Sequence, residues 1–355
     1  AASDVYKRQH WGYLTYIANE EVERQYLTDG GKYKYYDSDA DKNDYSWFVK
    51  AAYNFGSGWN AFADMQMRIV DYTTDGVNDK FIKGKKDGRK FYTQQQLNID
   101  ETYVFYNPKA GISYTRGGHK AYASVAYANR EPERNNFTDN SSAALPKAEH
   151  LFDTELGYQY RTANWYASAN LYYMRYINQF VMTGAKSDIG EAITSNIKNS
   201  YRLGAELSAG WSPLQWLSLE GNAALSQNKL KNFTEEVEAW DTEAVHNTYA
   251  KSTLSYSPSA ILNGFVDVHF GGFSATWHTN FVSRQYLDNT ESSERSIPSY
   301  SQTDLAFNYT SKVSKVLGMK QVTLGIDFNN IFNRHYAASG YVYYDWYNEG
   351  KRTST

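Results

Sequence analysis

The sequence has no cysteine and only 6 prolines and 24 glycines in 355 residues, and its 36 Lys and Arg nearly balance its 39 Asp and Glu. The absence of cysteine excludes disulfides, thiol nucleophiles and cysteine metal ligands. The low proline and glycine content excludes collagen-like and low-complexity chains. A net charge of −3 provides no general basic field, so we expect no nucleic-acid partner.

Long apolar runs are also missing. Only 41% of the residues are hydrophobic, and the mean hydropathy is −0.68. No stretch approaches the roughly 18 uncharged apolar residues that a spanning helix needs, the longest candidate being Ala209 to Leu219. The sequence therefore excludes membrane-spanning helices. Aromatic residues, in contrast, are abundant, with 33 Tyr, 17 Phe and 9 Trp.

Residues of opposite character alternate along much of the chain, as they do in half-buried β-strands. In the stretch 202–211, every second residue is Leu, Ala or Trp, and the residues between them are Arg, Gly, Glu or Ser. The stretches 217–225 and 322–329 show the same split, and weaker copies recur elsewhere. The pattern predicts about thirteen strands and no amphipathic helix.

The connections between the expected strands alternate in length. Tight turns are expected at 56–58, 116–118, 162–164, 212–214 and 271–272, and between them lie long polar segments at 29–44, 73–96, 131–149, 184–196, 230–246 and 287–299. In an up-and-down antiparallel sheet this order places the turns at one end and the long loops at the other. That arrangement is typical of transmembrane β-barrels, whereas Greek-key sandwiches have no reason to sort their loops.

Charged residues follow the same division. Lysine or arginine at mid-depth on a lipid-facing surface would cost about 2–4 kcal/mol. The charged residues of the clearest strands share the polar side, which in a closed barrel lines the lumen. These expected wall residues are Arg202, Glu206, Glu220, Asp304 and Asp327.

Six short motifs resemble, in order, the C-terminal part of TonB-dependent outer-membrane receptors, especially those of Bacteroidetes-like bacteria and of the siderophore-receptor type. The motifs occupy residues 107–114, 127–137, 155–158, 200–207, 285–290 and 329–333. Each motif alone is weak, but their order and barrel-type spacing are fairly specific. The resemblance extends over roughly residues 10 to 346.

The resemblance implies a plugged barrel of about 22 strands in the outer membrane of a Gram-negative bacterium. Such receptors bind a scarce nutrient and import it with energy relayed by TonB through a TonB box on the plug. The implied partners are lipid, the protein's own N-terminal plug, TonB and a small nutrient ligand. An iron chelate (siderophore) is the first choice of cargo, and a glycan- or vitamin-importing receptor of the same class is an alternative.

The resemblance also suggests a division of the chain. We expect residues 1–9 to be an assembly scar or a disordered segment, because they lack the alternation that follows. Residues 10–346 are expected to form the C-terminal portion of the receptor barrel, partial because about thirteen strands cannot close it. Residues 347–355 are expected to be a tail truncated before a missing last strand.

Candidate ligand contacts are basic or aromatic residues at the expected long-loop end. They are Lys83, Lys85, Lys86 and Arg89 in one segment, Arg130 and Arg134 in the next connection, and Trp240 in a third. A basic mouth would attract an anionic ligand such as a ferric siderophore. The competing interpretations are a solvated charged loop for the lysines and an ion-pair network that fixes the loop for Arg130 and Arg134.

Catalytic signatures are absent from the sequence. The turn at 56–58 lacks the nucleophile elbow of hydrolases, and neither a phosphate-binding loop nor a dinucleotide fingerprint occurs. We therefore expect no catalytic, cofactor or metal site. Two other classes remain open: a soluble secreted carbohydrate-binding β-protein and, less favoured, an outer-membrane barrel enzyme.

Overall fold

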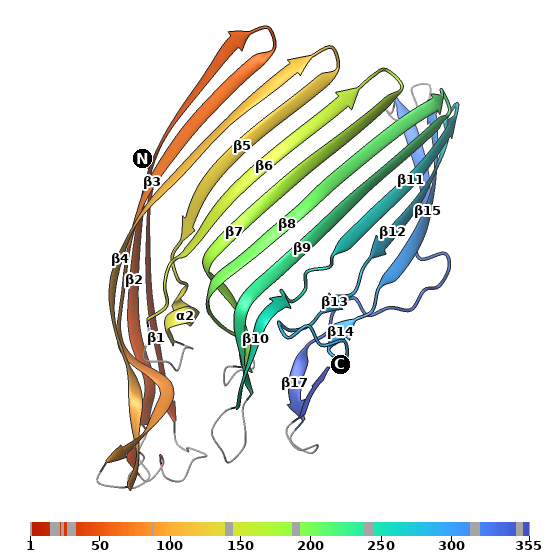
Figure 1. Cartoon of the computed structure of the whole chain (residues 1–355). Helices are drawn as coiled ribbons and strands as arrows, with labels where there is room; N and C mark the ends of the chain where they lie inside the picture. Colours follow the sequence, from red (N-terminus) through yellow and green to blue (C-terminus); the bar gives the residue numbers. More distant parts are fainter. Residues whose placement is uncertain are drawn as a thin grey trace. The chain divides into compact units, whose positions relative to one another are not determined.

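The computed structural model describes residues 2–14, 22, 25–26, 33–86, 89–138, 145–186, 192–237, 245–312, 320–345 and 351–354. The main element is an antiparallel sheet whose strands follow one another in chain order (Figure 1). Thirteen strands form its continuous path, and a further strand, β10, pairs only with β9. None of the helices in the described ranges is long and apolar enough to span a membrane.

The strands of this sheet are β1 (Ala2–Leu14), β2 (Tyr33–Gly56), β3 (Trp59–Lys86), β4 (Arg89–Arg116), β5 (His119–Arg130), β6 (Glu149–Arg161), β7 (Trp165–Lys186), β8 (Ala192–Leu214), β9 (Leu217–Val237), β10 (Val245–Thr253), β11 (Ala260–Phe270), β12 (Phe273–Val282), β15 (Tyr300–Lys312) and β16 (Gln321–Phe328). Two short pairs lie outside the sheet: β13 (Gln285–Tyr286) with β14 (Ser296–Ile297), and β17 (Val342–Asp345) with β18 (Lys351–Ser354). A short helix, α2 (Arg134–Thr138), follows β5.

The order of the connections confirms the predicted up-and-down topology. Tight turns join β2 to β3, β4 to β5, β6 to β7, β8 to β9 and β11 to β12, and the connections between these hairpins are longer except between β3 and β4. The turn after β8 is at Gln215 and Trp216, slightly later than the predicted 212–214. The thirteen strands of the main path agree with the predicted number.

The expected long loops are shorter than predicted, because the strands continue into them. Strand β3 runs to Lys86 and β4 begins at Arg89, so most of the segment 73–96 is a two-stranded extension rather than a loop. One face of this extension is nevertheless covered, because Thr74 and Gln94 are buried there. Residues 2–9, which we had set apart from the barrel, form the first part of β1 and pair with β2.

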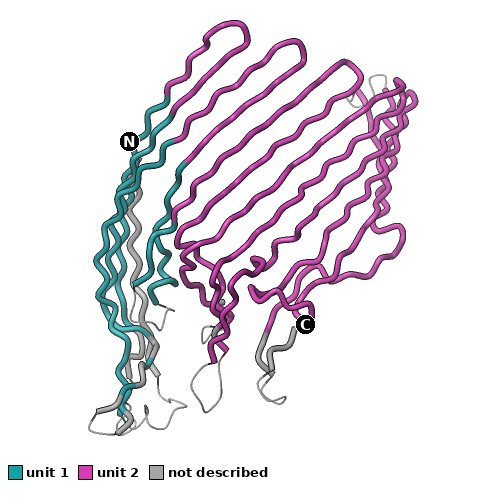
Figure 2. The backbone as a smooth tube through the Cα atoms, viewed as in Figure 1, with its two compact units in different colours: residues 1–50, 64–108, 127–149 teal, residues 51–63, 109–126, 150–355 magenta. Residues whose placement is uncertain are grey.

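The chain forms two compact units (Figure 2). The first unit contains residues 1–50, 64–108 and 127–149. Its core is a cluster of buried Tyr72, Leu97, Ile99 and Phe137, where the Tyr72 and Phe137 rings stack at 5.4 Å between centroids. The core therefore joins β3, β4 and α2.

The second unit contains residues 51–63, 109–126 and 150–355, which include every tight turn described above. Strand register gives its sheet two distinct faces. Leu207 pairs with Ala169 and Ala223, whereas its neighbour Glu206 pairs with Asn170 and Ala224. Large hydrophobic side chains are exposed on the first face, among them Leu171, Leu203, Leu207, Leu225, Leu262, Val266, Trp277, Leu324 and Ile326. A surface this apolar must contact something other than water.

Candidate ligand-binding site

The connection after β5 begins with a buried carboxylate. The Glu131 side chain is only 8% exposed, and one of its oxygens accepts a hydrogen bond from Lys42 Nζ at 2.7 Å. Arg68 Nη1 and Nη2 donate to the two Glu131 oxygens at 2.8 and 2.9 Å. Strands β2 and β3 and the first residue after β5 therefore form one charged cluster at the start of this connection.

Arg68 links this cluster to a second carboxylate. Its Nε lies 3.0 and 2.9 Å from the two Asp44 oxygens, and Nη2 also donates to Asp44. The planar guanidinium group has five donors in a rigid fork, which suits two carboxylates at once. Arg68 thus fixes the spacing between β2 and the segment that follows β5.

Helix α2 is held against the first unit by both polar and apolar contacts. Asn136 Oδ1 accepts a hydrogen bond from the Glu133 backbone N–H at 2.7 Å, next to the start of the helix. Phe137 is part of the buried core, and the Thr138 carbonyl accepts a hydrogen bond from Asn78 Nδ2 at 3.0 Å. The connection is consequently a packed structure rather than a free loop.

A cavity of about 280 Å³ lies beside this connection, entirely within the first unit. Its lining combines two cations, Lys42 and Arg134, with the carboxylates of Asp41, Glu131 and Glu133. Tyr72 also lines the cavity, and its buried hydroxyl has no hydrogen-bond partner among the described residues. Because small-molecule sites commonly measure roughly 300–1,000 Å³, this cavity can hold part of a ligand rather than a whole metal chelate.

The charge state of Glu131 follows from its surroundings. Burial alone would raise the pKa of this carboxyl, but the hydrogen bonds from Lys42 and Arg68 outweigh burial, so the pKa is lowered from its ordinary 4.5. Glu131 is therefore ionised at neutral pH. Its negative charge is paired with Lys42 and Arg68. Arg134 is partly exposed and donates a hydrogen bond to Ser38 Oγ at 2.9 Å.

A second connection, between β12 and β15, is fixed in a similar way within the second unit. The motif 285–290 provides buried Leu287, Asp288, Asn289 and Thr290. Asn289 accepts a hydrogen bond from the Ser255 backbone and donates one to the Met182 carbonyl, both at 2.8 Å. The motif therefore ties its own connection to strand β7 and to the connection between β10 and β11.

Ion pairs close the same connection. Arg295 Nε lies 2.7 Å from Asp288 Oδ2, and Lys229 Nζ lies 3.0 Å from Glu291 Oε1. Burial would raise the pKa of Glu291, but the hydrogen bonds from Lys229 and Thr253 lower it. Glu235, from the acidic segment 230–246, is buried and accepts a hydrogen bond from the Tyr249 hydroxyl at 3.1 Å.

The structure places the predicted ligand contacts as follows. Arg130 is exposed and forms an ion pair with Glu149 at 3.1 Å, and Arg134 lines the cavity described above. The side chains of Lys83, Lys85, Lys86 and Arg89 lie outside the described ones, although their backbones belong to the hairpin of β3 and β4. Trp240 lies outside the described residues.

The five predicted wall residues share one face of the sheet. Arg202 and Glu206 lie on the polar side of β8, and Glu220 pairs with Gly210 of that side. Glu220 pairs with Phe265 of β11, which pairs with His278 of β12, and His278 in turn pairs with Asp304 of β15. Asp327 pairs with Ala306 on the same face. The carboxylates and Arg202 are thus separated from the apolar face by strand alternation.

Sequence reasoning missed the residues that complete the charged cluster. Lys42 and Asp44 fell in a segment expected to be a loop, and Arg68 fell within a weakly alternating strand. Lys42 and Glu131 are 89 positions apart, so no local pattern reveals their contact. A weak signal was the acidic run Asp37, Asp39 and Asp41 with Lys42, which is unusual for a lipid-facing strand.

Comparison with known families identifies the sheet. The family model described as TonB dependent receptor-like, beta-barrel matches residues 3–331. A search of curated proteins gave no match.

Several solved structures are similar in fold. They include the ferric yersiniabactin uptake receptor FyuA from Yersinia pestis, at 15% identity and a TM-score of 0.58 over 88% of this chain and 44% of that chain. The siderophore receptor PiuA from Acinetobacter baumannii matches at 13% identity and a TM-score of 0.63 over 92% and 42%. The copper transporter OprC matches at 13% identity and a TM-score of 0.64 over 94% and 50%.

These identities show a shared fold and do not extend to cargo. The chain spans between 42% and 50% of the length of these three structures. The match to the family model, in contrast, extends over nearly the whole chain and agrees with the antiparallel up-and-down sheet. The chain therefore belongs to the family of TonB-dependent receptor β-barrels.

Proposed function

We propose that this chain is the barrel portion of an outer-membrane receptor that imports a ferric siderophore with energy from TonB. The proposal is supported first by the family match over residues 3–331. Two of the similar structures are described as a ferric yersiniabactin uptake receptor and a siderophore receptor, which supports an iron chelate as the cargo. A plug domain and TonB are the protein partners that the family implies, and we expect no enzymatic activity.

The two faces of the second unit support a position in the membrane. The exposed apolar face suits contact with lipid, and the opposite face, with Glu206, Glu220 and Asp304, suits a water-filled barrel interior. In outer-membrane barrels the short turns face the periplasm and the long connections face outside. By this rule the charged cluster around Glu131 lies on the extracellular side.

The ligand is captured on this extracellular side. The hairpin of β3 and β4 carries Lys83, Lys85, Lys86 and Arg89 near its tip, and these charges would attract an anionic chelate. The cavity beside α2 offers Arg134 as a cation and the Tyr72 hydroxyl as a free donor. Both features favour a ligand with several oxygen acceptors and a negative charge.

Two alternatives predict different results. The family match favours a membrane receptor over the soluble carbohydrate-binding protein that the sequence had left open. Within the family, the copper transporter OprC shows that a similar barrel is compatible with another metal cargo. Vitamins and glycans are further cargoes to be separated by experiment.

The test uses the complete receptor in Gram-negative cells that lack their own siderophore receptors. Uptake of radioactive iron should appear with one or more ferric siderophores and should disappear when TonB is deleted. Copper, cobalamin and oligosaccharides serve as competing cargoes in the same cells. Uptake of one of these together with no uptake of any ferric chelate would contradict the proposal.

A charge-reversal variant tests the basic hairpin. Replacing Lys83, Lys85, Lys86 and Arg89 with glutamate should reduce the association rate of an anionic chelate by about tenfold at low salt, and by less at high salt. The matched control replaces Lys312 and Lys320, which flank a connection at the tight-turn end, and should leave binding unchanged. Equal losses in both variants would indicate a general charge effect and not a ligand site.

A further inference from the structure

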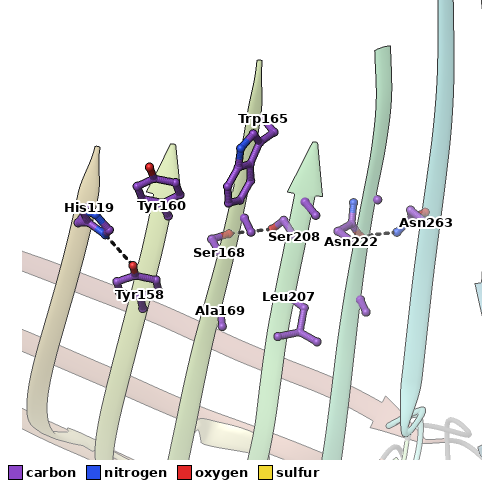
Figure 3. Close-up of a pocket in the computed structure, with 14 residues that line it drawn as sticks. His119, Tyr158, Tyr160, Trp165, Ser168, Ala169, Leu207, Ser208, Asn222 and Asn263 are labelled. Atoms are coloured by element: carbon purple, nitrogen blue, oxygen red, sulfur yellow. Dashed lines mark hydrogen bonds between the residues drawn. The ribbon is translucent and has the colours of Figure 1, made fainter. Parts of the chain in front are cut away.

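A second hollow lies on the apolar face of the second unit, away from the charged cluster. It measures about 770 Å³, within the roughly 300–1,000 Å³ typical of small-molecule sites. Figure 3 shows the residues around it, which come from neighbouring strands of the sheet. Most of its lining is small, apolar or aromatic. The exceptions belong by alternation to the polar face of the sheet; they are Ser168, Ser208, Asn222 and Asn263.

The hollow exists because small side chains meet in register across three strands. Ala209 pairs with Ala167 on one side and with Gly221 on the other. Leu207 pairs with Ala169 and Ala223, one step further along the same face. Larger residues surround this floor, and the shape is therefore a shallow groove in an otherwise bulky surface. They are Tyr158, Tyr160, Trp165, Leu171, Trp211 and Leu225.

One end of the groove is polar and cationic. His119 Nδ1 and the Tyr158 hydroxyl are 2.7 Å apart, and the His119 ring lies 4.4 Å from the Tyr160 ring (Figure 3). Arg116 pairs with His119 across the tight turn between β4 and β5, on the same face. Next to this turn, the Trp59 and Tyr114 rings pack together with their centroids 4.9 Å apart. Such paired aromatic rings are typical of the aromatic belt at a membrane interface.

The charges on this surface are complementary to an anion. By register, five carboxylates of β6, β8, β9 and β11 lie on the opposite face of the sheet: Asp153, Glu155, Glu206, Glu220 and Asp267. A second copy of the chain would therefore bring none of these five to Arg116 and His119. A phospholipid has both required parts, an apolar chain for the floor and a phosphate for the cationic end.

We propose that this groove binds a phospholipid of the membrane leaflet at the tight-turn end, with one acyl chain over Ala169, Ala209 and Gly221 and the phosphate beside Arg116 and His119. The inference rests on the proposed position of the apolar face against lipid. It adds a specific lipid site to that surface. The bound chain continues the apolar band across a place where the protein provides too few side-chain atoms.

The test reconstitutes the complete receptor in liposomes of phosphatidylethanolamine and phosphatidylglycerol that contain a phospholipid with a photoreactive acyl chain. After irradiation, labelled peptides are identified by mass spectrometry. Because a groove adds contact area to a lipid chain, labelling of residues 158–169, 207–209 and 221–223 should exceed that around Leu324 and Ile326, which lie on the same face away from the groove, by about threefold or more. Replacing both Arg116 and His119 with alanine should lower this excess.

Filling the groove gives the sharper comparison. The double variant Ala209→Phe and Gly221→Leu should reduce the excess to the level of the surrounding face. A Cβ atom added at Gly221 would meet its nearest atom, the Asn263 carbonyl oxygen, at 3.5 Å, an ordinary van der Waals contact. The matched control is Ala205→Phe, which lies on the same face of β8 between Leu171 and Leu225 in register and does not line the groove.

The outcomes separate the lipid site from the membrane position. Folding of each variant is checked by the shift in electrophoretic mobility on heating. Even labelling over the whole apolar face, unchanged by groove filling, would overturn the lipid site and leave the membrane position intact. Labelling of no part of this face would overturn both. A light-induced link between two receptor copies at the groove would assign it to a second copy and also overturn the proposal.

Discussion

Two regions of the molecule, the core of the first unit and the apolar face of the second, are built from the same kind of antiparallel strands but place apolar side chains in different surroundings. In the first unit, Tyr72 of β3 and Leu97 and Ile99 of β4 are buried against Phe137 of α2. In the second unit, Leu203 of β8, Leu225 of β9 and Ile326 of β16 remain 48%, 43% and 61% exposed. The core of the first unit is therefore covered by protein, whereas the apolar face of the second unit's sheet is left for a different solvent.

This difference shows how the surroundings of a strand determine its pattern. A strand between lipid and water needs one wholly apolar and one polar face, because a charge in lipid has no partner. An extension in water has no such requirement, and charged residues can share a face with apolar ones if they are paired. In β3, every second residue from 68 to 72 lies on the same face, and this face carries a charged residue beside apolar ones. The three residues are Arg68, Val70 and Tyr72, and all are at least half-buried.

The largest effect is expected from a charge placed on the apolar face of the second unit. Leu225→Arg should destabilise the receptor folded in a phospholipid bilayer by about 2–4 kcal/mol. The measurement is a denaturant titration of the complete receptor refolding into liposomes. The change reaches this size only if Leu225 contacts hydrocarbon rather than water or protein.

The neighbouring residue provides the control. Ala224 lies on the opposite face, where it pairs with Glu206 of β8. Ala224→Arg should change the folding free energy by less than about 1 kcal/mol, since an exposed ion pair contributes little in water. If the two variants lose stability equally, the two faces do not differ in solvent and the comparison between the units fails.

A smaller effect is expected from the charged cluster in the first unit. Arg68→Leu leaves Asp44 and Glu131 without their shared cation. Removing one partner of a fully buried pair costs about 3–5 kcal/mol. Because the Arg68 and Asp44 side chains are each 23% exposed, we expect a loss of about 1–3 kcal/mol, after allowing for solvent screening. Hydrogen exchange of the amides in α2 and in the adjoining part of β3 measures this loss.

Arg130 serves as the matched control for Arg68. It is also an arginine paired with a glutamate in this unit, but its side chain is 51% exposed. Arg130→Leu should therefore reduce protection in α2 by less than about 1 kcal/mol. Similar losses for the two arginines would mean that burial does not control the strength of these pairs.

The sequence alone predicted the parts of the fold that depend on local pattern. Period-two alternation gave the number of strands, and the order of short and long connections gave the up-and-down topology that the structure confirms. The polar face with Glu206 and Asp327 also follows from alternation, since each strand reports its own two faces. These features need no knowledge of distant contacts.

The limits of the strands and the charged cluster were not predicted. Segment 73–96 of the β3–β4 hairpin was interpreted as a loop, because the residues buried on it, Thr74 and Gln94, are polar and give no apolar alternation. Helix α2 has five residues and depends on Asn136 and Phe137 contacts rather than on an amphipathic pattern. The cluster of Lys42, Arg68 and Glu131 requires two strands and a distant connection to meet, which no local pattern encodes. The ligand contacts at Lys83, Lys85, Lys86, Arg89 and Trp240 stay predictions.

The smallest expected effect is a pH dependence confined to the first unit. The pKa of Glu131 is lowered in the folded protein, because Lys42 and Arg68 outweigh the cost of burial. The unfolded chain therefore binds a proton more readily, and stability falls as the pH drops. Protection of α2 amides should be constant from neutral pH down to the ordinary glutamate pKa of 4.5 and should decrease below it. Glu131→Gln should be less stable at neutral pH and should lose part of this acid sensitivity, while amides between β8 and β9 keep their protection throughout. If the wild type and the glutamine variant showed the same pH profile, the paired carboxylate would not be what holds this connection in place.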